Sequence, residues 1–271
     1  MLARAITGFY VFVSLLSLAR AATPGFDNAA DPVYGGNGAG SFNGDDGGAP
    51  TFGPWVVTEN PSGTSTAGSF IGDSTTLAPG NSGGEINSSG VSFGLFGYDG
   101  AYVNAIRSFD APLSIGQTFA IQLAVNFRNG NKGMDVTDAN GNNIFDLNIG
   151  GDVYSVNNTG GGTTNLFNNT YDPNTVFTVS LTQTSSTEGS WTIVRSGGLT
   201  GTASSGIFPY IGVAAGINLY NVQTTDGGLP QDNLFFNNLA IVPEPSTFAL
   251  LAVSAFLGTL LYVCRRREEQ F

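Results

Sequence analysis

The sequence predicts an all-β protein, a single antiparallel β-sandwich or jelly roll, flanked by an N-terminal signal helix and a C-terminal transmembrane helix. Three observations predict this fold. Apolar and polar residues alternate with period two in several runs, Gly, Asn, Asp and Ser residues gather between those runs, and residues 22–242 contain no convincing amphipathic helix. A segment of that length is common for one sandwich domain.

The first 21 residues are typical of a secretory signal peptide. Arg4 gives a short basic start, residues 5–18 form an apolar run, and Ala19 and Ala21 fit the small-x-small rule for cleavage by signal peptidase. The run is short for a spanning helix, which needs roughly 20 residues. We therefore predict that the signal helix is removed and that the mature chain begins at Ala22.

Residues 22–53 are predicted to form a Gly-rich loop or a loosely ordered arm. Residues 35–40 and 45–48 consist almost entirely of Gly, Asn, Asp and Ala, which offer little surface to bury. The sandwich itself is predicted to span residues 54–242.

The strand pattern is clearest over residues 117–127. Alternate positions there carry one apolar set, which is predicted to face the core: Phe119, Ile121, Leu123, Val125 and Phe127. Residues 145–149 and 177–182 repeat the alternation, and another run begins at Trp191. The strongest hairpin signals are four dipeptides: Asn129-Gly130, Asn140-Gly141, Gly150-Gly151 and Asp226-Gly227. One dry and one wet face per strand is typical of antiparallel sheets.

The C-terminal segment has the features of a membrane anchor. Residues 247–263 carry no charge and are followed by the basic cluster Arg265, Arg266 and Arg267. A run of about 17 residues is just long enough to cross a bilayer. Because basic residues beside a span stay in the cytoplasm, we predict a transmembrane helix over residues 247–263 with the body of the protein outside.

Directly before this span stand Pro243, Glu244 and Pro245, whose two prolines favour an extended backbone. The proline motif, the apolar span and the arginine cluster in this order resemble the PEP-CTERM sorting signal of bacterial surface proteins, over roughly residues 242–267. Residues 232–239 also resemble a stretch found ahead of this signal, and the resemblance implies a jelly-roll-like ectodomain. It further implies recognition by an exosortase, removal of the tail, and passage from an inner-membrane-anchored precursor to the cell envelope or extracellular matrix.

The composition excludes several classes of function. The 271 residues include only nine Lys and Arg against 20 Asp and Glu, for a net charge of -11, so the chain lacks a basic surface for nucleic acid. No His is present and the single cysteine, Cys264, follows the apolar tail, which removes Ser-His and Cys-His nucleophiles. Lys132, the one lysine, lies in a predicted turn. We therefore predict a protein that is not an enzyme and that requires no cofactor and no metal.

Two alternative hypotheses give the carboxylates a chemical role, either in glycoside hydrolysis or in calcium binding. Glycoside hydrolysis requires only two of them, and Asp135, Asp138 and Asp146 lie close in the sequence, although residues 138–141 predict a turn. Asp138, Asn140 and Asn142 also alternate like the start of a calcium loop, but Gly141 comes one residue too early for an EF-hand. A hairpin turn is the favoured interpretation.

Exposed tyrosines could serve as flat platforms for sugars, because an aromatic ring presents an apolar face beside a polar tip. Tyr98, Tyr102 and Tyr154 are the candidate glycan contacts, and Tyr171 and Tyr220 are further aromatic candidates. The leading hypothesis is an exported, non-enzymatic protein of the cell envelope or exopolysaccharide matrix. The alternative is a carbohydrate-binding module whose partner is the exopolysaccharide.

Overall fold

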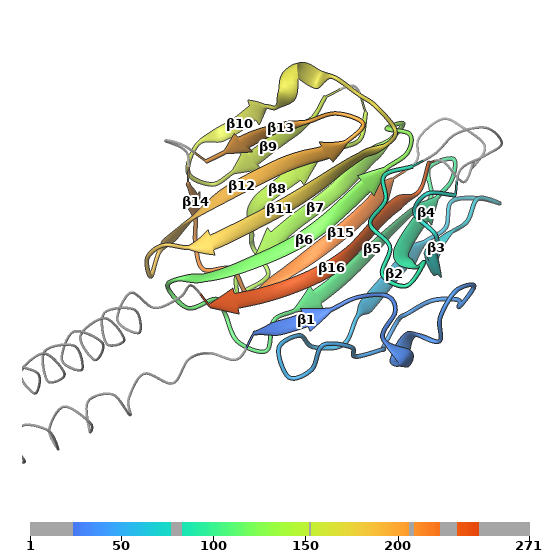
Figure 1. The fold of residues 1–271 in the computed structure, drawn as a ribbon, viewed down its shortest axis with the longest axis horizontal. Coiled ribbons are helices and arrows are strands. Elements are labelled where there is room, and N and C mark those ends of the chain that lie inside the picture. The colour runs from blue at the N-terminus through green and yellow to red at the C-terminus, as the bar shows by residue number, and fades with distance from the viewer. Residues whose placement is uncertain (1–23, 77–82, 152, 206–208, 223–231, 244–271) are drawn as a thin grey trace, which may run out of the picture. The chain divides into compact units, whose positions relative to one another are not determined.

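The structure is a computed structural model that describes residues 24–76, 83–151, 153–205, 209–222 and 232–243 (Figure 1). These residues form strands β1–β16 in two antiparallel sheets and two one-turn 3-10 helices, η1 (Pro32–Tyr34) and η2 (Phe167–Asn169). The all-β prediction is therefore confirmed.

Both predicted terminal helices lie outside the described residues. This applies to the signal peptide with Ala19 and Ala21, and to the predicted span over residues 247–263. Other predicted features outside the described residues are Glu244, Pro245, Arg265, Arg266 and Arg267. Within the described part of the chain, no helix is long and apolar enough to cross a membrane.

The first sheet has nine strands in the order β13-β12-β11-β6-β16-β4-β3, with β1 also paired to β16 and β14 to β12. Its strands are β1 (Gly25–Asp27), β3 (Ala67–Gly72), β4 (Ser92–Gly97), β6 (Gln117–Val125), β11 (Thr175–Gln183), β12 (Glu188–Gly197), β13 (Gly201–Ser204), β14 (Tyr210–Ile211) and β16 (Leu234–Pro243). The last strand ends at Pro243, where the predicted sorting segment begins.

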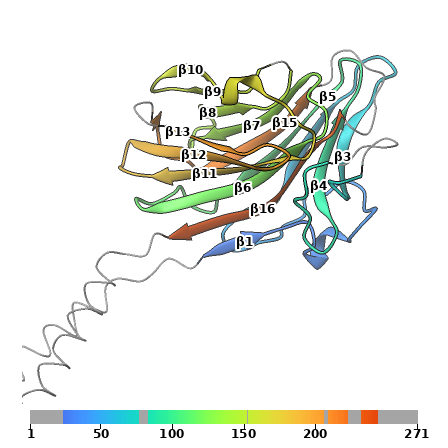
Figure 2. The same cartoon turned by 45° about the horizontal axis from the view of Figure 1, so that its top comes forward.

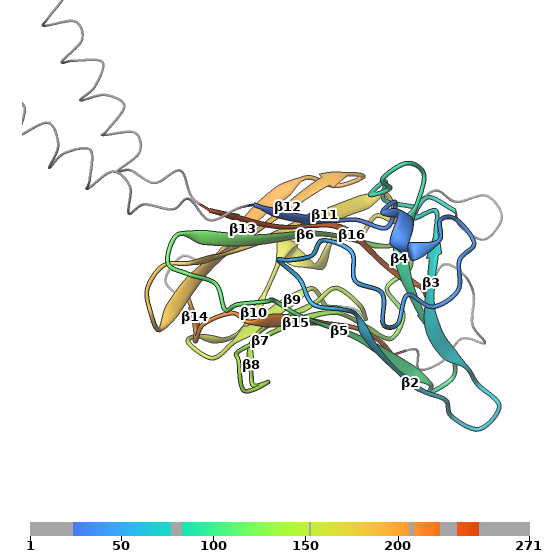
Figure 3. The ribbon, with the colours of Figure 1, turned by 90° about the horizontal axis from the view of Figure 1, so that it is seen from below.

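The second sheet has seven strands in the order β10-β9-β8-β7-β15-β5-β2. Its strands are β2 (Val56–Asn60), β5 (Tyr102–Ser108), β7 (Asn131–Thr137), β8 (Asn143–Asn148), β9 (Ser155–Asn158), β10 (Gly162–Asn165) and β15 (Gly216–Val222). Figure 2 shows the two sheets obliquely, and in Figure 3, seen along the layers, they lie face to face, as expected of a sandwich.

Alternating side chains fill the space between the sheets. The run predicted over residues 117–127 forms β6, in which Phe119, Ile121, Leu123 and Val125 are buried. The strand ends at Val125, so Phe127, predicted to share this face, is 40% exposed instead. The period-two pattern thus identifies the strand and misplaces only the residue beyond its end.

The predicted turns differ in what they connect. Asn140-Gly141 closes the hairpin between β7 and β8, with Gly141 in the left-handed region at a φ of 81°. Asn129-Gly130 does not close a hairpin, because β6 before it and β7 after it belong to different sheets. This segment carries the chain across the sandwich, and sequence alone does not distinguish the two uses of such a turn.

The N-terminal arm is packed more closely than its composition predicts. Residues 24–53 are mainly irregular, yet Tyr34, Phe42 and Phe52 are at most 2% exposed and belong to the hydrophobic core. Phe42 packs edge-on against Phe93 of β4 with ring centroids 5.0 Å apart. Three scattered aromatic residues therefore anchor an arm that is otherwise rich in glycine.

A buried arginine explains why part of the arm consists of glycine. Arg107 of β5 has no exposed side-chain surface, and its Nη1 atom lies 2.5 Å from Oδ2 of Asp27 on β1. Its Nη2 donates to the carbonyl of Gly47. A Cβ at position 47 would meet Asp27 Oδ1 and Tyr34 Oη at 2.5 Å each. Glycine lets the arm backbone approach the ion pair.

Further contacts complete the Arg107 cluster, which we define as Asp27, Tyr34, Arg107, Phe52 and Trp55. The Tyr34 hydroxyl donates to Asp27 at 2.8 Å and accepts from Arg107 at 2.9 Å. The guanidinium lies 5.2 Å from the ring centroid of Phe52 and 4.7 Å from that of Trp55. Burial raises the pKa of Asp27, and the charge of Arg107 opposes that shift. The cluster ties β1 of one sheet to β5 of the other.

We predict that Asp27→Ala lowers the free energy of unfolding by about 3–5 kcal/mol, because it leaves a buried guanidinium without its counter-ion. Denaturant unfolding measures this loss. Asp46→Ala is the matched control, because the Asp46 side chain is 43% exposed and lies 3.8 Å from the same guanidinium. It should cost less than about 1 kcal/mol. Equal losses in the two variants would contradict a dominant role for the Asp27 pair.

Candidate functional site

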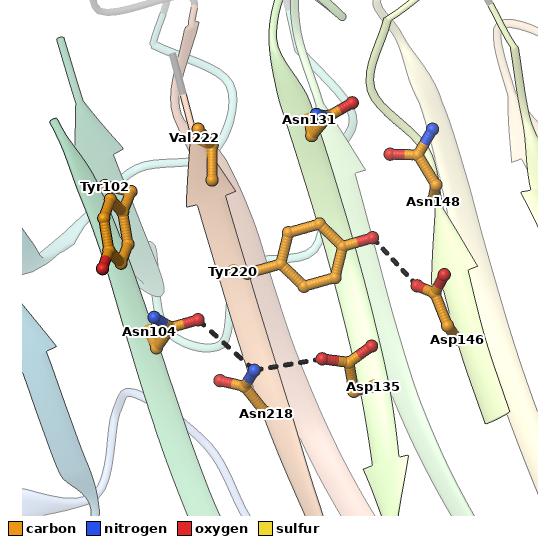
Figure 4. A pocket seen from close by; sticks show the side chains of 9 residues that line it. All are labelled: Tyr102, Asn104, Asn131, Asp135, Asp146, Asn148, Asn218, Tyr220 and Val222. Atoms are coloured by element: carbon orange, nitrogen blue, oxygen red, sulfur yellow. Dashed lines mark hydrogen bonds between the residues drawn. The ribbon is translucent and has the colours of Figure 1, made fainter. Parts of the chain in front are cut away.

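A groove of about 500 Å³ lies on the outer face of the seven-stranded sheet. It crosses four neighbouring strands, β5, β15, β7 and β8 (Figure 4). Eight of its nine lining residues carry a polar group, with two tyrosines, four asparagines, two aspartates and one valine: Tyr102, Asn104, Asn131, Asp135, Asp146, Asn148, Asn218, Tyr220 and Val222. The groove is therefore an open surface that offers both polar groups and tyrosine rings.

Strand alternation places these side chains. In β5 the buried positions Val103, Ala105 and Arg107 alternate with Tyr102 and Asn104, which point outward. The same holds in β15, where Ile217 and Leu219 are buried while Asn218, Tyr220 and Val222 line the groove. Each strand thus supplies one face to the core and the other to the groove.

Two carboxyls meet in the groove because of the β7–β8 hairpin. Its register pairs Asp135 with Asp146 and Gly133 with Asn148. Gly133 is also opposite Tyr220 of β15, and a Cβ at position 133 would meet Leu147 O at 1.9 Å and Tyr220 Oη at 2.7 Å. The glycine leaves space for the tyrosine side chain to extend across β7 toward β8.

Hydrogen bonds fix the orientation of the lining side chains (Figure 4). The Tyr220 hydroxyl donates to Asp146 Oδ1 at 2.9 Å. Asn218 Nδ2 donates to Asp135 Oδ2 at 3.1 Å and to Asn104 Oδ1 at 3.3 Å. The four strands are thereby linked through their side chains as well as through their backbones.

The two carboxyls do not ionise independently. Burial is the main cause that raises the pKa of Asp146 to about 6, and the nearby charge of Asp135 adds to it. Burial also raises the pKa of Asp135, opposed by its hydrogen bond from Asn218. Two like charges in a half-buried site disfavour full ionisation. The pair therefore retains a proton at a higher pH than two exposed aspartates would.

The three predicted glycan contacts do not come together. Tyr102 lines the groove and is 40% exposed. Tyr98 is half-buried outside the groove, with its ring 5.2 Å from that of Phe96. Tyr154 is only 2% exposed and packs edge-on against Phe177. Its burial does not fit the expected exposed platform, because its ring belongs to the hydrophobic core.

Sequence patterns indicate the other groove residues for different reasons or not at all. They suggest Asp135 and Asp146 as hydrolase carboxylates, and Tyr220 as one of several aromatic candidates. Counting strand positions outward from the Asn140-Gly141 turn would have placed the two carboxyls opposite each other. No comparable local signal leads to Asn104 and Asn218, because their strands lie far apart in the sequence.

The carboxylate of Asp138 accepts hydrogen bonds from residues of its own turn. Its Oδ1 accepts from the backbone N–H groups of Asn140 and Asn142, both at 2.9 Å. Its Oδ2 accepts from Asn142 Nδ2 at 3.0 Å. These bonds, with that from the Asn142 side chain first, lower the pKa of Asp138. Its side chain caps the hairpin turn, which supports the turn interpretation of residues 138–142.

In the described part of the chain, no three His, Cys, Asp or Glu residues form a metal-binding group.

Comparison with protein families identifies the C-terminal segment. The model of the PEP-CTERM protein-sorting motif matches residues 242–267. The chain carries the PEP-CTERM sorting motif. This finding confirms the resemblance carried by the proline motif, the apolar span and the arginine cluster. The motif implies an exported protein that is sorted through an exosortase by way of a membrane-anchored precursor.

Comparisons of the whole chain are less informative. No curated protein matches the sequence. A solved structure described as "Cell entry of botulinum neurotoxin type C is dependent upon interaction with two ganglioside molecules" aligns at 13% identity, with a TM-score of 0.37 over 69% of this chain. The chain spans 47%, about half, of that neurotoxin chain.

An alginate lyase from Corynebacterium sp. aligns at 12% identity and a TM-score of 0.39, over 69% of this chain and 93% of the lyase. At these scores neither similarity bears on function, and the fold follows from the strand pairing of the chain itself.

We predict that the Asp135–Asp146 pair makes stability fall as the pH rises from about 4 to about 6. The folded pKa of Asp146 is about 6 against an ordinary value of 3.8, so its stabilising contribution is complete below the lower value and lost above the higher one. Asp146→Asn removes this dependence. The unfolding temperature of the variant relative to the wild type should therefore be higher at pH 8 than at pH 4.

Asp138→Asn is the control of opposite sign, because the pKa of Asp138 is lowered in the folded state. Its stability relative to the wild type should be lower at pH 8 than at pH 2, because a carboxyl with a lowered folded pKa loses its stabilising contribution only as the pH falls below 3.8. A carboxyl titration of Asp146 near pH 4, followed by NMR, would contradict the proposed coupling.

Proposed function

We propose that the protein is an exported, non-enzymatic polysaccharide-binding protein of the cell envelope or exopolysaccharide matrix. One observation carries the proposal: the polar groove on the seven-stranded sheet combines tyrosine rings with amide side chains. Export follows from the PEP-CTERM motif. The groove would then be presented to the polymers that surround the cell.

The groove chemistry suits sugar hydroxyls. Each hydroxyl can donate and accept a hydrogen bond, and each asparagine amide offers both a carbonyl oxygen and N–H donors. Tyr102, 40% exposed, adds a ring whose apolar face can pack against a sugar ring. The combination of amides and an exposed ring favours sugars over apolar ligands.

The dimensions of the groove favour a chain over a single small molecule. Its lining side chains come from four adjacent strands. Neighbouring strands are about 4.8 Å apart, so the lining extends roughly 14 Å across the sheet. That length accommodates more than one monosaccharide. A polysaccharide segment therefore fits the site better than a monosaccharide.

The carboxyl arrangement favours binding over glycoside hydrolysis. Hydrolases hold two carboxyl groups on either side of the scissile bond, roughly 5–5.5 or 6.5–9.5 Å apart. Asp135 and Asp146 are instead direct cross-strand partners, and each accepts a hydrogen bond from a neighbouring groove side chain, Asp135 from Asn218 and Asp146 from Tyr220. Both carboxyls are therefore engaged with the groove wall, which favours a role in binding.

We predict that the full-length protein in mild detergent binds a polysaccharide from a panel that includes the exopolysaccharide of the source organism. Tyr102→Ala should weaken binding about tenfold, which corresponds to roughly 1.4 kcal/mol of lost contact. Isothermal titration measures the change. Tyr98→Ala is the matched control, because Tyr98 lies outside the groove, and it should leave the affinity unchanged. If the wild type binds no polysaccharide, a purely structural role remains.

We also propose that Pro243, Glu244 and Pro245 are the segment that an exosortase recognises, and that Arg265, Arg266 and Arg267 hold the precursor in the membrane until the tail is removed. The match of the sorting motif to residues 242–267 supports this proposal. Signal peptidase would act earlier, at Ala21.

We predict that Glu244→Ala slows tail removal several-fold and that deletion of residues 265–267 alters localisation of the precursor. Pulse-chase labelling of cells with an active exosortase follows both. Glu59→Ala, which removes an exposed glutamate from the sandwich, is the control and should be processed normally. Normal processing and localisation of both test variants would refute the assignment.

A further inference from the structure

A second hollow of about 380 Å³ adjoins the groove. Asn131 lines both, so the two meet at this residue, at the start of β7. The second hollow is formed by the segment that crosses between the sheets and is lined chiefly by Phe127, Arg128 and Tyr171. We call it the Arg128 hollow.

Arg128 differs from the other cations of the described chain. The described residues include four basic side chains, of which Arg107 and Lys132 are fully buried and Arg195 is 7% exposed. Arg128 is only partly buried and faces a hollow. It is therefore the described cation that a ligand can reach most readily.

The guanidinium is held in position by uncharged partners. Its Nη1 donates to the carbonyl of Asn169 at 2.9 Å. Its Cζ lies 5.3 Å from the ring centroid of Tyr154 and 5.2 Å from that of Tyr171. The buried Tyr154 side chain, which does not fit the role of a sugar platform, here supports the arginine. Such support reduces the entropy lost when a ligand binds.

Arg128 has spare capacity for an anion. Among the described residues no carboxylate lies within ion-pair distance of it, because both ion pairs there belong to Arg107. A guanidinium has five N–H donors arranged in a fork that matches a carboxylate. Asp172, next to Tyr171, adds a negative charge nearby without pairing with Arg128.

We propose that Arg128 binds the carboxylate of an acidic sugar, so that the polysaccharide held by the groove is a uronic acid polymer. This inference rests on the proposed polysaccharide binding and names its ligand class. The exposed ring of Phe127 and the ring of Tyr171 flank the same hollow and can pack against the sugar. The Asp135–Asp146 pair lies in the adjoining groove, where it favours hydroxyls over a second carboxylate. The groove and the Arg128 hollow together set the position of the polymer.

The test compares polygalacturonate with the same polymer after reduction of its carboxylates to alcohols. We expect the full-length wild type to bind polygalacturonate about tenfold more tightly, as charge-assisted hydrogen bonds predict. Arg128→Gln should abolish this preference and leave binding of the reduced polymer unchanged. Arg128→Lys should retain part of the preference, because lysine keeps the charge and loses the fork.

Asn104→Ala is the control within the groove and should weaken binding of both polymers by similar factors. Unchanged binding of the reduced polymer by Arg128→Gln also shows that this variant is folded.

A second experiment compares binding of dextran sulfate with binding of dextran. An equal Arg128-dependent preference for sulfate would overturn the carboxylate assignment in favour of a general anion site.

Equal wild-type affinity for polygalacturonate and its reduced form would overturn the inference and leave the proposed function intact. If Arg128→Gln still binds polygalacturonate more tightly than the reduced polymer, the inference is likewise overturned and the proposed function is left intact. Failure of the wild type to bind any polymer would instead refute the proposed function, and the inference with it.

Discussion

The buried ion pair between Arg107 and Asp27 constrains the rest of the structure. It joins β5 of the seven-stranded sheet to β1 of the nine-stranded sheet and holds the glycine-rich arm against the core. A charge buried this deeply tolerates no register slip, because a shift of one residue would turn Arg107 outward and reverse both faces of β5. The pair that closes the sandwich therefore also determines that Tyr102 and Asn104 face the groove.

The distribution of charge follows from the same constraint. Arg107 and Lys132 are turned inward, so the acidic chain presents few cations. On the groove face, Asp135 and Asp146 limit each other's ionisation, which reduces the negative charge that a polymer meets. Arg128 lies at the continuation of this surface, supported by tyrosine rings. Under the proposed function, the groove and the accessible Arg128 beside it would distinguish ligands by charge as well as by shape.

Sequence patterns predict the fold better than the site. Alternation over β6 and the Asn140-Gly141 turn identify strands and a hairpin because both signals are local. The arm is less predictable, because Tyr34, Phe42 and Phe52 are isolated among glycines and are buried by residues distant in the sequence, Arg107 for Tyr34 and Phe52, and Phe93 for Phe42. Likewise Asn104 and Asn218 meet only because β5 pairs with β15. The C-terminal signal is identified directly, since its recognition depends on contiguous residues.

The groove is tested most directly by observing its side-chain amides while a ligand binds. Titration of the ¹⁵N-labelled full-length protein with oligosaccharides from the source organism's exopolysaccharide, followed by two-dimensional NMR, resolves the four asparagine amides that line it. We predict saturable shifts of Asn104, Asn131, Asn148 and Asn218, with Asn126 and Asn237, buried on the side of the nine-stranded sheet, unchanged. Saturable shifts confined to residues outside the groove, or no shifts at any ligand concentration, would contradict a polysaccharide-binding face on the seven-stranded sheet.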